Sequence, residues 1–379
     1  MKSFVIETSG KQAREAVASF LRGLLEQGLV EALLVPQDLP SGDGVSYSLV
    51  SSINHGDGMN PFAPVMPVNA AKLISCLTIR RPGKRIGALL RPCEIRALIE
   101  LVKLRQASLE ELIIIGMDCM GTYPMRGYSC IARMRPGKSL GEELLSAFRD
   151  GDRRREMEFG MRSACQICDR PFPENAHITL CLFGMDTSRE IGIEAKEEIA
   201  DGLATKFDLK EGEREVRRKE AISRLIEERK KRQEELATQF KERVKTVSGL
   251  LQEISTCMNC HNCRVACPIC YCRECLFDSP TLAHEPREYL RWAERKGALR
   301  FPADTLLYHI GRMNHMLTSC VGCGQCEAAC PNMVPLLKMF PIIAREVQKQ
   351  FEYTAGRALD EPLPLTTFRE EELTHVERH

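Results

Sequence analysis

Two copies of one cysteine pattern constrain this chain more than any other feature of its sequence. The first copy is Cys257-x-x-Cys260-x-x-Cys263-x-x-x-Cys267-Pro268, and the second is Cys320-x-x-Cys323-x-x-Cys326-x-x-x-Cys330-Pro331. In iron–sulfur sites of this spacing, one tight loop supplies three thiolates and the fourth cysteine serves the other cluster. We therefore expect one 4Fe-4S cluster on Cys257, Cys260, Cys263 and Cys330, and another on Cys320, Cys323, Cys326 and Cys267. Zinc also binds Cys-x-x-Cys pairs, but a zinc site has no use for a third evenly spaced thiolate and a Cys-Pro.

The cysteine content also bears on the compartment. The chain has 379 residues, 18 of them cysteines, and it begins Met1-Lys2-Ser3-Phe4-Val5 without an apolar signal region. We therefore expect reduced, metal-binding thiols in a cytoplasm rather than disulfides. The densest apolar run, at residues 112–115, is too short for a membrane span. The 53 basic residues are interleaved with 52 acidic ones, so a nucleic-acid-binding face is not expected.

Residues 1–190 predict an α/β domain. Apolar periodicity predicts helices at 13–27, 70–77 and 94–104, and strands at 29–35, 85–91 and 112–117. This alternation predicts a parallel sheet with crossover helices. Residues 36–70 are rich in Gly, Pro, Ser and Asn, and we expect loops there that cover a site. Such sheets bind ligands at the carboxyl ends of their strands, so Pro92-Cys93 and Asp118-Cys119 mark the candidate site.

A charged segment at residues 191–254 predicts a long linker helix. One helix of ~45 residues is the simplest interpretation of its broken apolar stripe. Because Arg229, Lys230 and Gln233 interrupt the stripe, a solvated helix bridging two domains is favoured over a coiled coil. Residues 255–345 then predict an all-helical ferredoxin domain with two clusters. Residues 346–379 predict a tail that is poorly ordered from Gly356 onward.

Further cysteines lie outside the two motifs. Cys165-Gln166-Ile167-Cys168 on its own fits a redox dithiol, a zinc half-site or a cluster half-site. With Cys93 and Cys119 expected side by side at one sheet edge, the four can supply the thiolates of a third cubane. Cys130 is the rival for the fourth ligand, although it, like Cys76 and Cys181, is most simply a buried apolar thiol. Three more cysteines are interpreted as packing or cluster-shell residues, with a spare metal site as the alternative: Cys270, Cys272 and Cys275.

Several of these segments resemble a known family. Ile86-Gly87-Ala88-Leu89-Leu90-Arg91-Pro92-Cys93, Ile115-Gly116-Met117-Asp118-Cys119-Met120 and Cys165-Gln166-Ile167-Cys168-Asp169 resemble the three cysteine segments of the beta subunits of deazaflavin-reducing hydrogenases and formate dehydrogenases. The stretch His309–Pro335 is similar to the ferredoxin part of formate dehydrogenase beta subunits and of heterodisulfide-reductase-type proteins. The resemblance implies FAD beside a cubane cluster and hydride exchange with a deazaflavin coenzyme. It also implies that this cluster is held by Cys93, Cys119, Cys165 and Cys168.

The resemblance directs attention to residues that can contact a flavin. We expect Lys11 and the basic residues at 80–85 near its phosphates, Asn54 in the covering loop, and residues 91–96 with 118–123 along one rim of the crevice. The candidate flavin contacts are Lys11, Asn54, Arg80, Arg81, Lys84, Arg91 and Arg96. The plainer alternative makes the basic residues at 80–85 a solvated loop.

Four polar residues precede the second motif by one helix: His309, Arg312, Asn314 and His315. They are candidates to donate hydrogen bonds to cluster sulfurs, or else they cap and pack the helix.

Two functions are compatible with these features. In the first, an oxidoreductase subunit couples hydride exchange at FAD to one-electron transfer through three 4Fe-4S clusters and on to a partner subunit. In the second, a flavin-free electron-wire and docking subunit serves a heterodisulfide reductase, hydrogenase or formate dehydrogenase complex. The presence of bound flavin separates the two.

Overall fold

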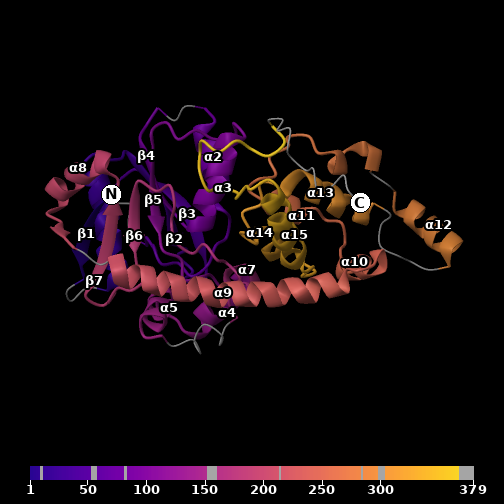
Figure 1. The fold of residues 1–379 in the computed structure, drawn as a ribbon, viewed down its shortest axis with the longest axis horizontal. Helices are drawn as coiled ribbons and strands as arrows, with labels where there is room; N and C mark the ends of the chain where they lie inside the picture. The colour runs from indigo at the N-terminus through magenta and orange to yellow at the C-terminus, as the bar shows by residue number, and fades with distance from the viewer. Residues whose placement is uncertain are drawn as a thin grey trace. The chain divides into compact units, whose positions relative to one another are not determined.

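Two compact units make up the protein, and a computed structural model describes residues 1–8, 12–52, 58–80, 83–151, 160–212, 215–282, 285–297 and 304–366 of them. The sheet unit comprises Met1–Arg232 and Gly356–Asp360, and the helical unit comprises Gln233–Ala355 and Glu361–His379. All the strands that the structure describes lie in the sheet unit (Figure 1). The predicted α/β domain followed by an all-helical domain is therefore confirmed.

A mixed sheet forms the frame of the sheet unit, in the order β3-β2-β4-β5-β6-β7-β1-β8. The strands are β1 (Lys2–Glu7), β2 (Ala32–Asp38), β3 (Val45–Val50), β4 (Ile86–Leu90), β5 (Leu112–Met117), β6 (Ile178–Cys181), β7 (Glu190–Ala195) and β8 (Lys210–Glu211). β2, β4, β5 and β6 are parallel neighbours, whereas β3, β7, β1 and β8 pair antiparallel. The predicted parallel sheet is thus confirmed at the centre and wrong at both edges, where shorter connections return the chain antiparallel.

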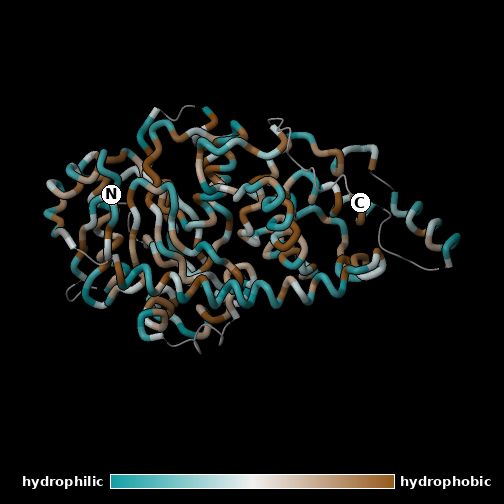
Figure 2. The backbone as a smooth tube through the Cα atoms, in the orientation of Figure 1, coloured by the Kyte–Doolittle hydropathy of each residue, from teal (hydrophilic) through white to brown (hydrophobic). Residues whose placement is uncertain are grey.

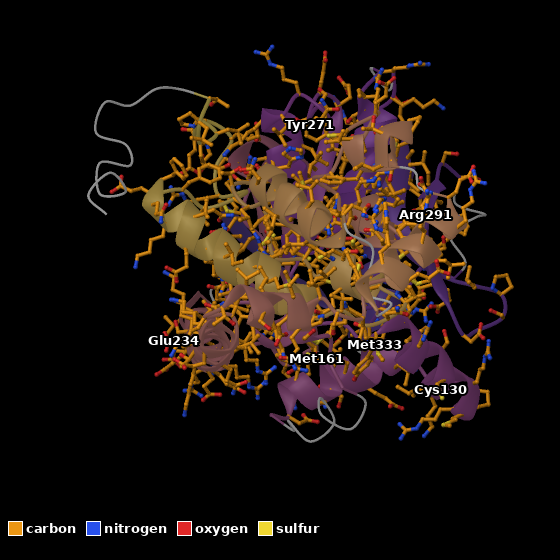
Figure 3. All side chains as sticks on the ribbon, turned by 90° about the vertical axis from the view of Figure 1, so that its right-hand side faces the viewer. Cys130, Met161, Glu234, Tyr271, Arg291 and Met333 are labelled. Carbon is orange, nitrogen blue, oxygen red and sulfur yellow. The ribbon has the colours of Figure 1, made fainter. Side chains whose placement is uncertain are left out.

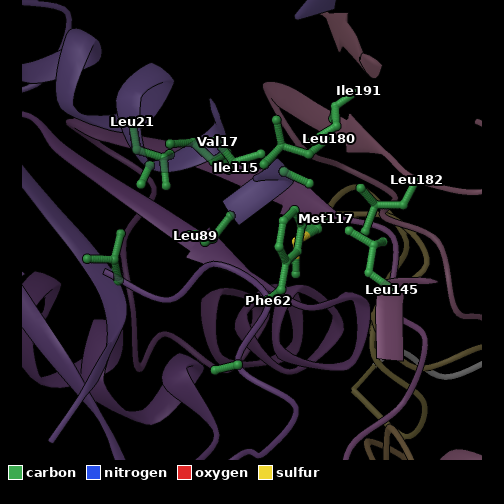
Figure 4. Packing of buried hydrophobic residues seen from close by; sticks show 14 of the residues in the cluster. Val17, Leu21, Phe62, Leu89, Ile115, Met117, Leu145, Leu180, Leu182 and Ile191 are labelled. Carbon is green, nitrogen blue, oxygen red and sulfur yellow. The ribbon is translucent and has the colours of Figure 1, made fainter. Parts of the chain in front are cut away.

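Helices cover both faces of this sheet. They are α1 (Ala13–Glu26), α2 (Ala70–Thr78), α3 (Pro92–Lys103), α4 (Met125–Met134), α5 (Leu140–Arg149), α7 (Ser163–Gln166) and α8 (Glu197–Phe207). On one face, Val17 and Leu21 of α1 share a core with Ile115 and Leu180 of the central strands (Figure 4). Side chains alternate along a strand, so the equally buried Ile114 points to the other face. There α3 contacts β5, and α2 packs on α3. Burial on both faces is what parallel strands require.

Residues 36–70 are not the continuous covering loop that the sequence predicts. β2 runs to Asp38, and β3 then pairs with it antiparallel, which places Tyr47 opposite Pro36. The serines at 46 and 48 weaken the apolar pattern by which a strand is predicted from sequence. An edge strand tolerates them because it can leave many polar side chains in solvent. One wall of the candidate site is therefore a hairpin.

The charged linker begins later and is shorter than predicted. Residues 191–211 contribute most of β7, α8 and β8 to the sheet unit, and the 29-residue helix α9 (Glu215–Arg243) follows. Figure 2 shows that α9 is mainly hydrophilic, and no helix in the described part of the chain is long and apolar enough to cross a membrane. Thr246 is extended and its hydroxyl accepts from the N–H of Gly249 at 3.1 Å, which begins a separate helix, α10 (Val247–Glu253). The expected single helix is therefore two helices.

The helical unit places the two cysteine motifs side by side. It contains α11 (Asn262–Ala266), α12 (Pro286–Lys296), α13 (Thr305–Met316), α14 (Gln325–Ala328), α15 (Leu336–Gln350) and the 3-10 turns η2 (Leu276–Asp278) and η3 (Pro280–Leu282). Cys263 lies in α11 and Cys326 lies in α14, and these two short helices contact each other. Each follows a residue in the left-handed region, His261 (φ 56) and Gly324 (φ 67). The repeated spacing in the sequence thus produces a repeated local structure.

As far as residue 366, the C-terminal segment is not the tail that the sequence predicts, and the rest of that predicted tail lies outside the described residues. α15 continues to Gln350 within the helical unit, and Gly356 belongs to the sheet unit. Its N–H donates to Oε1 of the fully buried Glu100 at 2.7 Å. Gly356 has φ +72, and a Cβ there would lie 2.5 Å from the Cα of Arg96. A buried carboxylate needs donors, which explains why residues 356–360 are held against α3.

Candidate iron–sulfur centres

Four cysteines of the sheet unit lie at the predicted edge of the sheet. Cys93 is the second residue of α3, directly after β4, and Cys119 is the second residue beyond β5. β4 and β5 are parallel neighbours, so both cysteines lie where these strands end. Cys165 lies in α7, and Cys168 follows it. The N–H of Cys119 donates to the carbonyl of Pro171 at 2.8 Å, which ties the segment after Cys168 to the same edge.

Electrostatic contacts show that the four thiols come together. Burial, together with neighbouring Cys165 and Cys168, raises the pKa of the Cys119 thiol to about 11. Burial alone would lower the pKa of Arg96, but Cys168 and Cys93 beside its guanidinium raise it. Cys130 is not in this group, because it lies exposed on α4 (Figure 3). The structure therefore brings together the set that contains Cys93.

The chemistry of this set fits a cluster. Among the residues that the structure describes, no three Cys, His, Asp or Glu side chains converge as the ligands of a single metal ion do. In a cubane each of the four thiolates binds a different iron, so the ligands stand further apart. The fit rests on the donors themselves, which are four sulfurs with the buried cations Arg91 and Arg96 next to them.

Arg91 organises the loop beside Cys93. Its Nη2 donates to the carbonyls of Ala63 and Val65 at 2.6 and 3.0 Å, and its Nη1 donates to the Tyr47 hydroxyl at 3.1 Å. The Tyr47 hydroxyl in turn donates to Oε1 of Glu94 at 2.7 Å. Burial raises the pKa of Tyr47 well above its usual value, so it keeps its proton. The Arg91 guanidinium is thus hydrogen-bonded to groups of the protein itself, and it places a buried positive charge near Cys93 and Cys119.

A second arginine reaches Cys165 through a hydroxyl. Arg162 is buried, and its Nη1 lies 3.4 Å from Thr122 Oγ1, which is itself 3.4 Å from Cys165 Sγ. A cluster ligand is a thiolate and can only accept, so in the metal-bound state the Thr122 hydroxyl donates to Cys165 and accepts from Arg162. Positive charge is thereby directed toward this sulfur.

Arg229 joins two cysteine loops to α9, and sequence reasoning missed it. It interrupts the apolar stripe, which predicted a solvated position, yet only 4% of it is exposed. Its Nη1 donates to the carbonyl of Cys168 at 3.1 Å, and its Nη2 donates to the carbonyl of Met120 at 3.3 Å. No residue type marks a backbone carbonyl as a partner, so the sequence carries little signal for this role.

The same helix is fixed to the sheet by Asp118. Its carboxylate accepts from the N–H groups of Leu182 and Phe183 at 2.9 and 3.1 Å, and from Nη2 of Arg218 at 2.7 Å. Burial raises the pKa of Asp118 to about 6, although Arg218 opposes this shift. The end of β5 is thus held next to Cys119 by the two residues that follow β6 and by Arg218 of α9.

The four candidate flavin contacts that the structure describes do not gather at one place. Lys11, Asn54 and Arg81 lie outside the described residues. Arg80 and Lys84 are exposed and precede β4, so they lie toward the amino ends of the strands, opposite to the cysteine edge. They therefore do not lie at the same edge as Cys93, and their role as flavin contacts stays a prediction beside the solvated-loop alternative. Arg91 and Arg96 do lie at the cysteine edge, where protein groups already bind them.

In the helical unit the motif cysteines form two sets, each drawn from both motifs. A cavity is lined by Cys257, Cys260, Cys263 and Cys330, together with Tyr308 and His309. The second set is Cys267, Cys320, Cys323 and Cys326, since the first three act electrostatically on Cys326. The structure thus places the fourth cysteine of each motif with the other motif's loop, in the arrangement expected from the spacing. We call these the Cys257 set and the Cys267 set.

Helix α13 presents polar side chains to the Cys257 set. Arg312 Nη1 donates to Cys263 Sγ at 3.0 Å, and His309 Nε2 lies 3.3 Å from Cys257 Sγ. Burial, followed by Arg312, lowers the pKa of His309 to about 4, so its ring is neutral. Tyr308, which the sequence marked only as part of a helix, places its hydroxyl 3.2 Å from Cys263 Sγ. Asn314 and His315 are exposed.

The three remaining cysteines of the helical unit differ in position. The N–H of Cys270 donates to the carbonyl of Cys267 at 3.3 Å, and burial and then Cys267 raise the pKa of Cys270 to about 11. Cys270 thus has the position of a cluster-shell residue. Cys272 is exposed and Cys275 precedes η2, and for these two the packing interpretation stays a prediction.

Comparison with known proteins shows what this chain is similar to. Residues 253–334 match the model of a 4Fe-4S dicluster domain. The chain is 26% identical over 375 residues to the F420-dependent formate dehydrogenase subunit beta of Methanocaldococcus jannaschii, covering 92% of this chain and 93% of that protein. It is 25% identical over 370 residues to the F420-dependent formate dehydrogenase 1 subunit beta of Methanococcus maripaludis, covering 90% of each.

A chain of the F420-reducing NiFe hydrogenase complex from Methanosarcina barkeri also aligns in structure, with a TM-score of 0.46 and 12% identity over 63% of this chain and 92% of that one. The sequence matches extend over nearly the whole length of the relatives, through both the sheet unit and the dicluster domain. The chain is therefore similar over nearly its whole length to beta subunits of F420-dependent formate dehydrogenases, and its residues 253–334 match a 4Fe-4S dicluster domain.

Proposed function

We propose that this chain transfers electrons between the deazaflavin coenzyme F420 and a partner subunit through three 4Fe-4S clusters. The clusters are held by the Cys257 set, the Cys267 set and the sheet-unit set of Cys93, Cys119, Cys165 and Cys168. Each bound cluster takes up and releases one electron at a time. Partner subunits of formate dehydrogenase, hydrogenase or heterodisulfide reductase type belong to this proposal, and a cytoplasmic location stays a prediction.

The third cluster is supported by one observation above the others. Four cysteines from three separate segments come together at the carboxyl ends of parallel strands, beside the buried Arg96. A chance group of buried thiols does not need a cation, because neutral thiols are the form that burial favours. Thiolates on a cluster do need compensating charge, and Arg91 and Arg96 supply it.

The residues of the sheet unit have definable tasks in this function. Arg229 and Arg91 fix the loops that carry the cysteines by binding backbone carbonyls. Thr122 orients toward Cys165, and Arg96 stands between Cys93 and Cys168. Together they hold four sulfurs in place and bring positive charge to a centre that gains negative charge on reduction.

The electron donor is inferred from the relatives, both of which are named as F420-dependent. A hydride carries two electrons and a cluster accepts one, so the complex needs a group that handles both, and FAD has that chemistry. We include FAD on this ground and assign none of the described residues to it. Among the described candidates, Arg80 and Lys84 lie away from the cysteine edge, which favours a second function, the flavin-free electron wire, in which the sheet unit holds its cluster and binds partners only.

Anaerobic purification of the full chain, followed by iron, sulfide and flavin analysis, tests these proposals. Three cubanes require ~12 irons per chain, and ~8 would remove the cluster from the sheet unit. Stoichiometric flavin supports hydride exchange within this chain. Twelve irons without flavin, in a chain that F420 cannot reduce, would leave the electron wire as its function.

The exchange of fourth cysteines has its own test. If Cys267 serves the cluster of Cys320, Cys323 and Cys326, Cys267→Ala should change the magnetic spectrum of that cluster. The cluster of the Cys257 set keeps all four ligands and should keep its spectrum. Damage confined to the Cys257 set's cluster would show that each motif closes on itself.

A further inference from the structure

Helix α13 directs one buried polar face at the Cys257 set. Tyr308, His309 and Arg312 are 1%, 1% and 3% exposed, although all three are polar or charged. Residues four apart lie on the same side of a helix, so Tyr308 and Arg312 reach the same sulfur, that of Cys263. Burying three such groups on one helix is costly unless their partners are strong acceptors. Cluster-bound thiolates are such acceptors.

The direction of these hydrogen bonds follows from the chemistry of the ligand. Cys263 bound to iron carries no proton, so the Tyr308 hydroxyl at 3.2 Å must donate to it. Arg312 donates through Nη1 to Cys263 Sγ at 3.0 Å and through Nη2 to the Cys263 carbonyl at 3.3 Å. His309 adds a contact of 3.3 Å to Cys257 Sγ. The Cys257 set therefore receives a charged donor, a hydroxyl and an imidazole from a single helix.

Arg312 also faces the other set. Its guanidinium carbon lies 4.7 Å from the centre of the Phe340 ring and 5.7 Å from that of Tyr308, which hold it in place. Cys326 and Cys267 are among the groups that act on its charge. An arginine keeps its charge at every accessible pH. One fixed positive charge therefore stands between the two thiolate sets, in direct contact with Cys263.

We propose that Arg312 and Tyr308 raise the reduction potential of the Cys257 set's cluster above that of the Cys267 set's cluster, which makes the former the electron-accepting end of the pair. Reduction adds one negative charge to a cluster, and donors on its sulfurs stabilise that charge. When one electron passes between them, the cluster of the Cys267 set is oxidised by one electron and that of the Cys257 set is reduced by one. Arg312 and Tyr308 keep their protons throughout. This inference rests on the proposed function, in that both sets must hold clusters.

The order of the two clusters' reduction potentials depends on the hydrogen-bond donors that each cysteine set receives. Arg312 acts on Cys326 of the Cys267 set through its charge, whereas the Cys257 set has that charge and the hydrogen bonds from Arg312 and Tyr308 as well. The Cys267 set also receives a backbone hydrogen bond, from Gly322 to Cys320. The Cys257 set has its own backbone donors, the N–H of Asn259 to Cys257 and that of Val334 to Cys330, both at 3.4 Å. Both sets therefore receive backbone donors, and the Cys257 set receives the side-chain donors of α13 besides.

The test is a redox titration of the anaerobically purified full chain, followed by electron paramagnetic resonance, with iron content measured on each sample. The variants are Tyr308→Phe, Arg312→Lys and Arg312→Gln, and Cys260→Ser identifies the signal of the Cys257 set. Tyr308→Phe keeps the aromatic packing on His261 and Phe277, so it removes little more than the donor. Arg291→Gln is the control for net charge, because Arg291 lies exposed on α12 (Figure 3).

Tyr308→Phe should lower the potential of the Cys257 set's cluster and leave the other unchanged. Arg312→Gln should lower both, that of the Cys257 set more, by about tenfold in the one-electron equilibrium constant, or about 59 mV. Arg312→Lys should lie between Arg312→Gln and the unaltered chain, and Arg291→Gln should change neither potential. If Arg312→Gln loses iron, the potentials measured in Tyr308→Phe and Arg312→Lys still test the inference.

Unchanged potentials in iron-replete Tyr308→Phe and Arg312→Lys, equal shifts of both clusters, or a lower potential for the Cys257 set's cluster in the unaltered chain would overturn the inference. An unaltered chain without clusters in the helical unit would instead refute the proposed function. The two failures are therefore distinguishable.

Discussion

Replacement of Arg229 tests whether α9 holds the sheet-unit cysteines in place. Arg229 is 4% exposed and donates to the carbonyls of Cys168 and Met120. Arg229→Met keeps a long apolar stem and removes both donors. The two carbonyls, one on each of two cysteine loops, then lose a charged partner. The loops should open more often without loss of the rest of the fold.

The size of the effect follows from these two bonds. A hydrogen bond to a charged group contributes about 1.5–3 kcal/mol, so losing two costs about 3 kcal/mol or more. Each 1.4 kcal/mol is about a factor of ten in an equilibrium constant. Local opening around Cys168 should therefore become about 100-fold more frequent. Iron bound by these loops should leave at a correspondingly higher rate.

The assay follows iron release to a chelator under anaerobic conditions. In Arg229→Met, ~4 of ~12 irons should leave about 100-fold faster, and the other ~8 at the rate of the unaltered chain. Lys230→Met is the matched control, because Lys230 is the next residue, carries the same charge and is exposed. Equal release rates in the two variants, or faster loss of all the iron in Arg229→Met, would refute the role given to Arg229.

Three further predictions follow. Cys93→Ala should lower the iron content by ~4 per chain while Cys130→Ala leaves it unchanged; iron loss in Cys130→Ala would restore that residue as a ligand. The ring of His177 accepts from the N–H of Ile114 at 3.0 Å, and burial lowers the pKa of His177 below its usual 6.5. As pH falls below about 6.5, His177 takes up a proton in the unfolded chain before it does so in the folded chain, so the sheet unit should lose stability. His177→Asn should weaken this pH dependence when thermal unfolding is compared at pH 7.5 and 5.5. Gly356→Ala should destabilise the sheet unit by more than about 1 kcal/mol, since the residue has φ +72 and no room for a Cβ; an unchanged unfolding midpoint would contradict this.

The parts of the fold that the sequence predicts well are those with a strong period. β5 begins and ends where its apolar run does, at Leu112–Met117, and α1 ends before Gly28, which has φ +65. β3 was missed because an edge strand next to solvent needs few apolar residues. The break between α9 and α10 was missed because it depends on one cap, that of Thr246, inside a sequence with high helix propensity.

The candidate site also has features that the sequence predicts and features that it does not. The approach of Cys93 to Cys119 was predictable, because the ends of neighbouring parallel strands meet at one edge. The pairing of Arg229 with backbone carbonyls was not, because any loop offers carbonyls and an arginine on a charged helix usually faces solvent. Tyr308 falls between these cases. Its spacing of four residues from Arg312 put it on the same helical face, but only the fold shows that this face meets Cys263.

Buried arginines and buried cysteines depend on each other in this protein. Burial raises the pKa of Cys320 to about 12 and that of Cys119 to about 11, so as free thiols both would be neutral at physiological pH. Arg312 is 3% exposed, and the described groups that raise its pKa are Cys263, Cys326, Tyr308 and Cys267, none of them a carboxylate. With neutral thiols its charge would be buried without a counter-ion, a condition that proteins avoid because it costs several kcal/mol. Iron binding removes that cost, since it converts the cysteines to thiolates and gives the guanidinium its partner. The arrangement around Arg312 should therefore be more stable with the metal in place, and loading the Cys257 and Cys267 sets should be coupled to the folding of the helical unit.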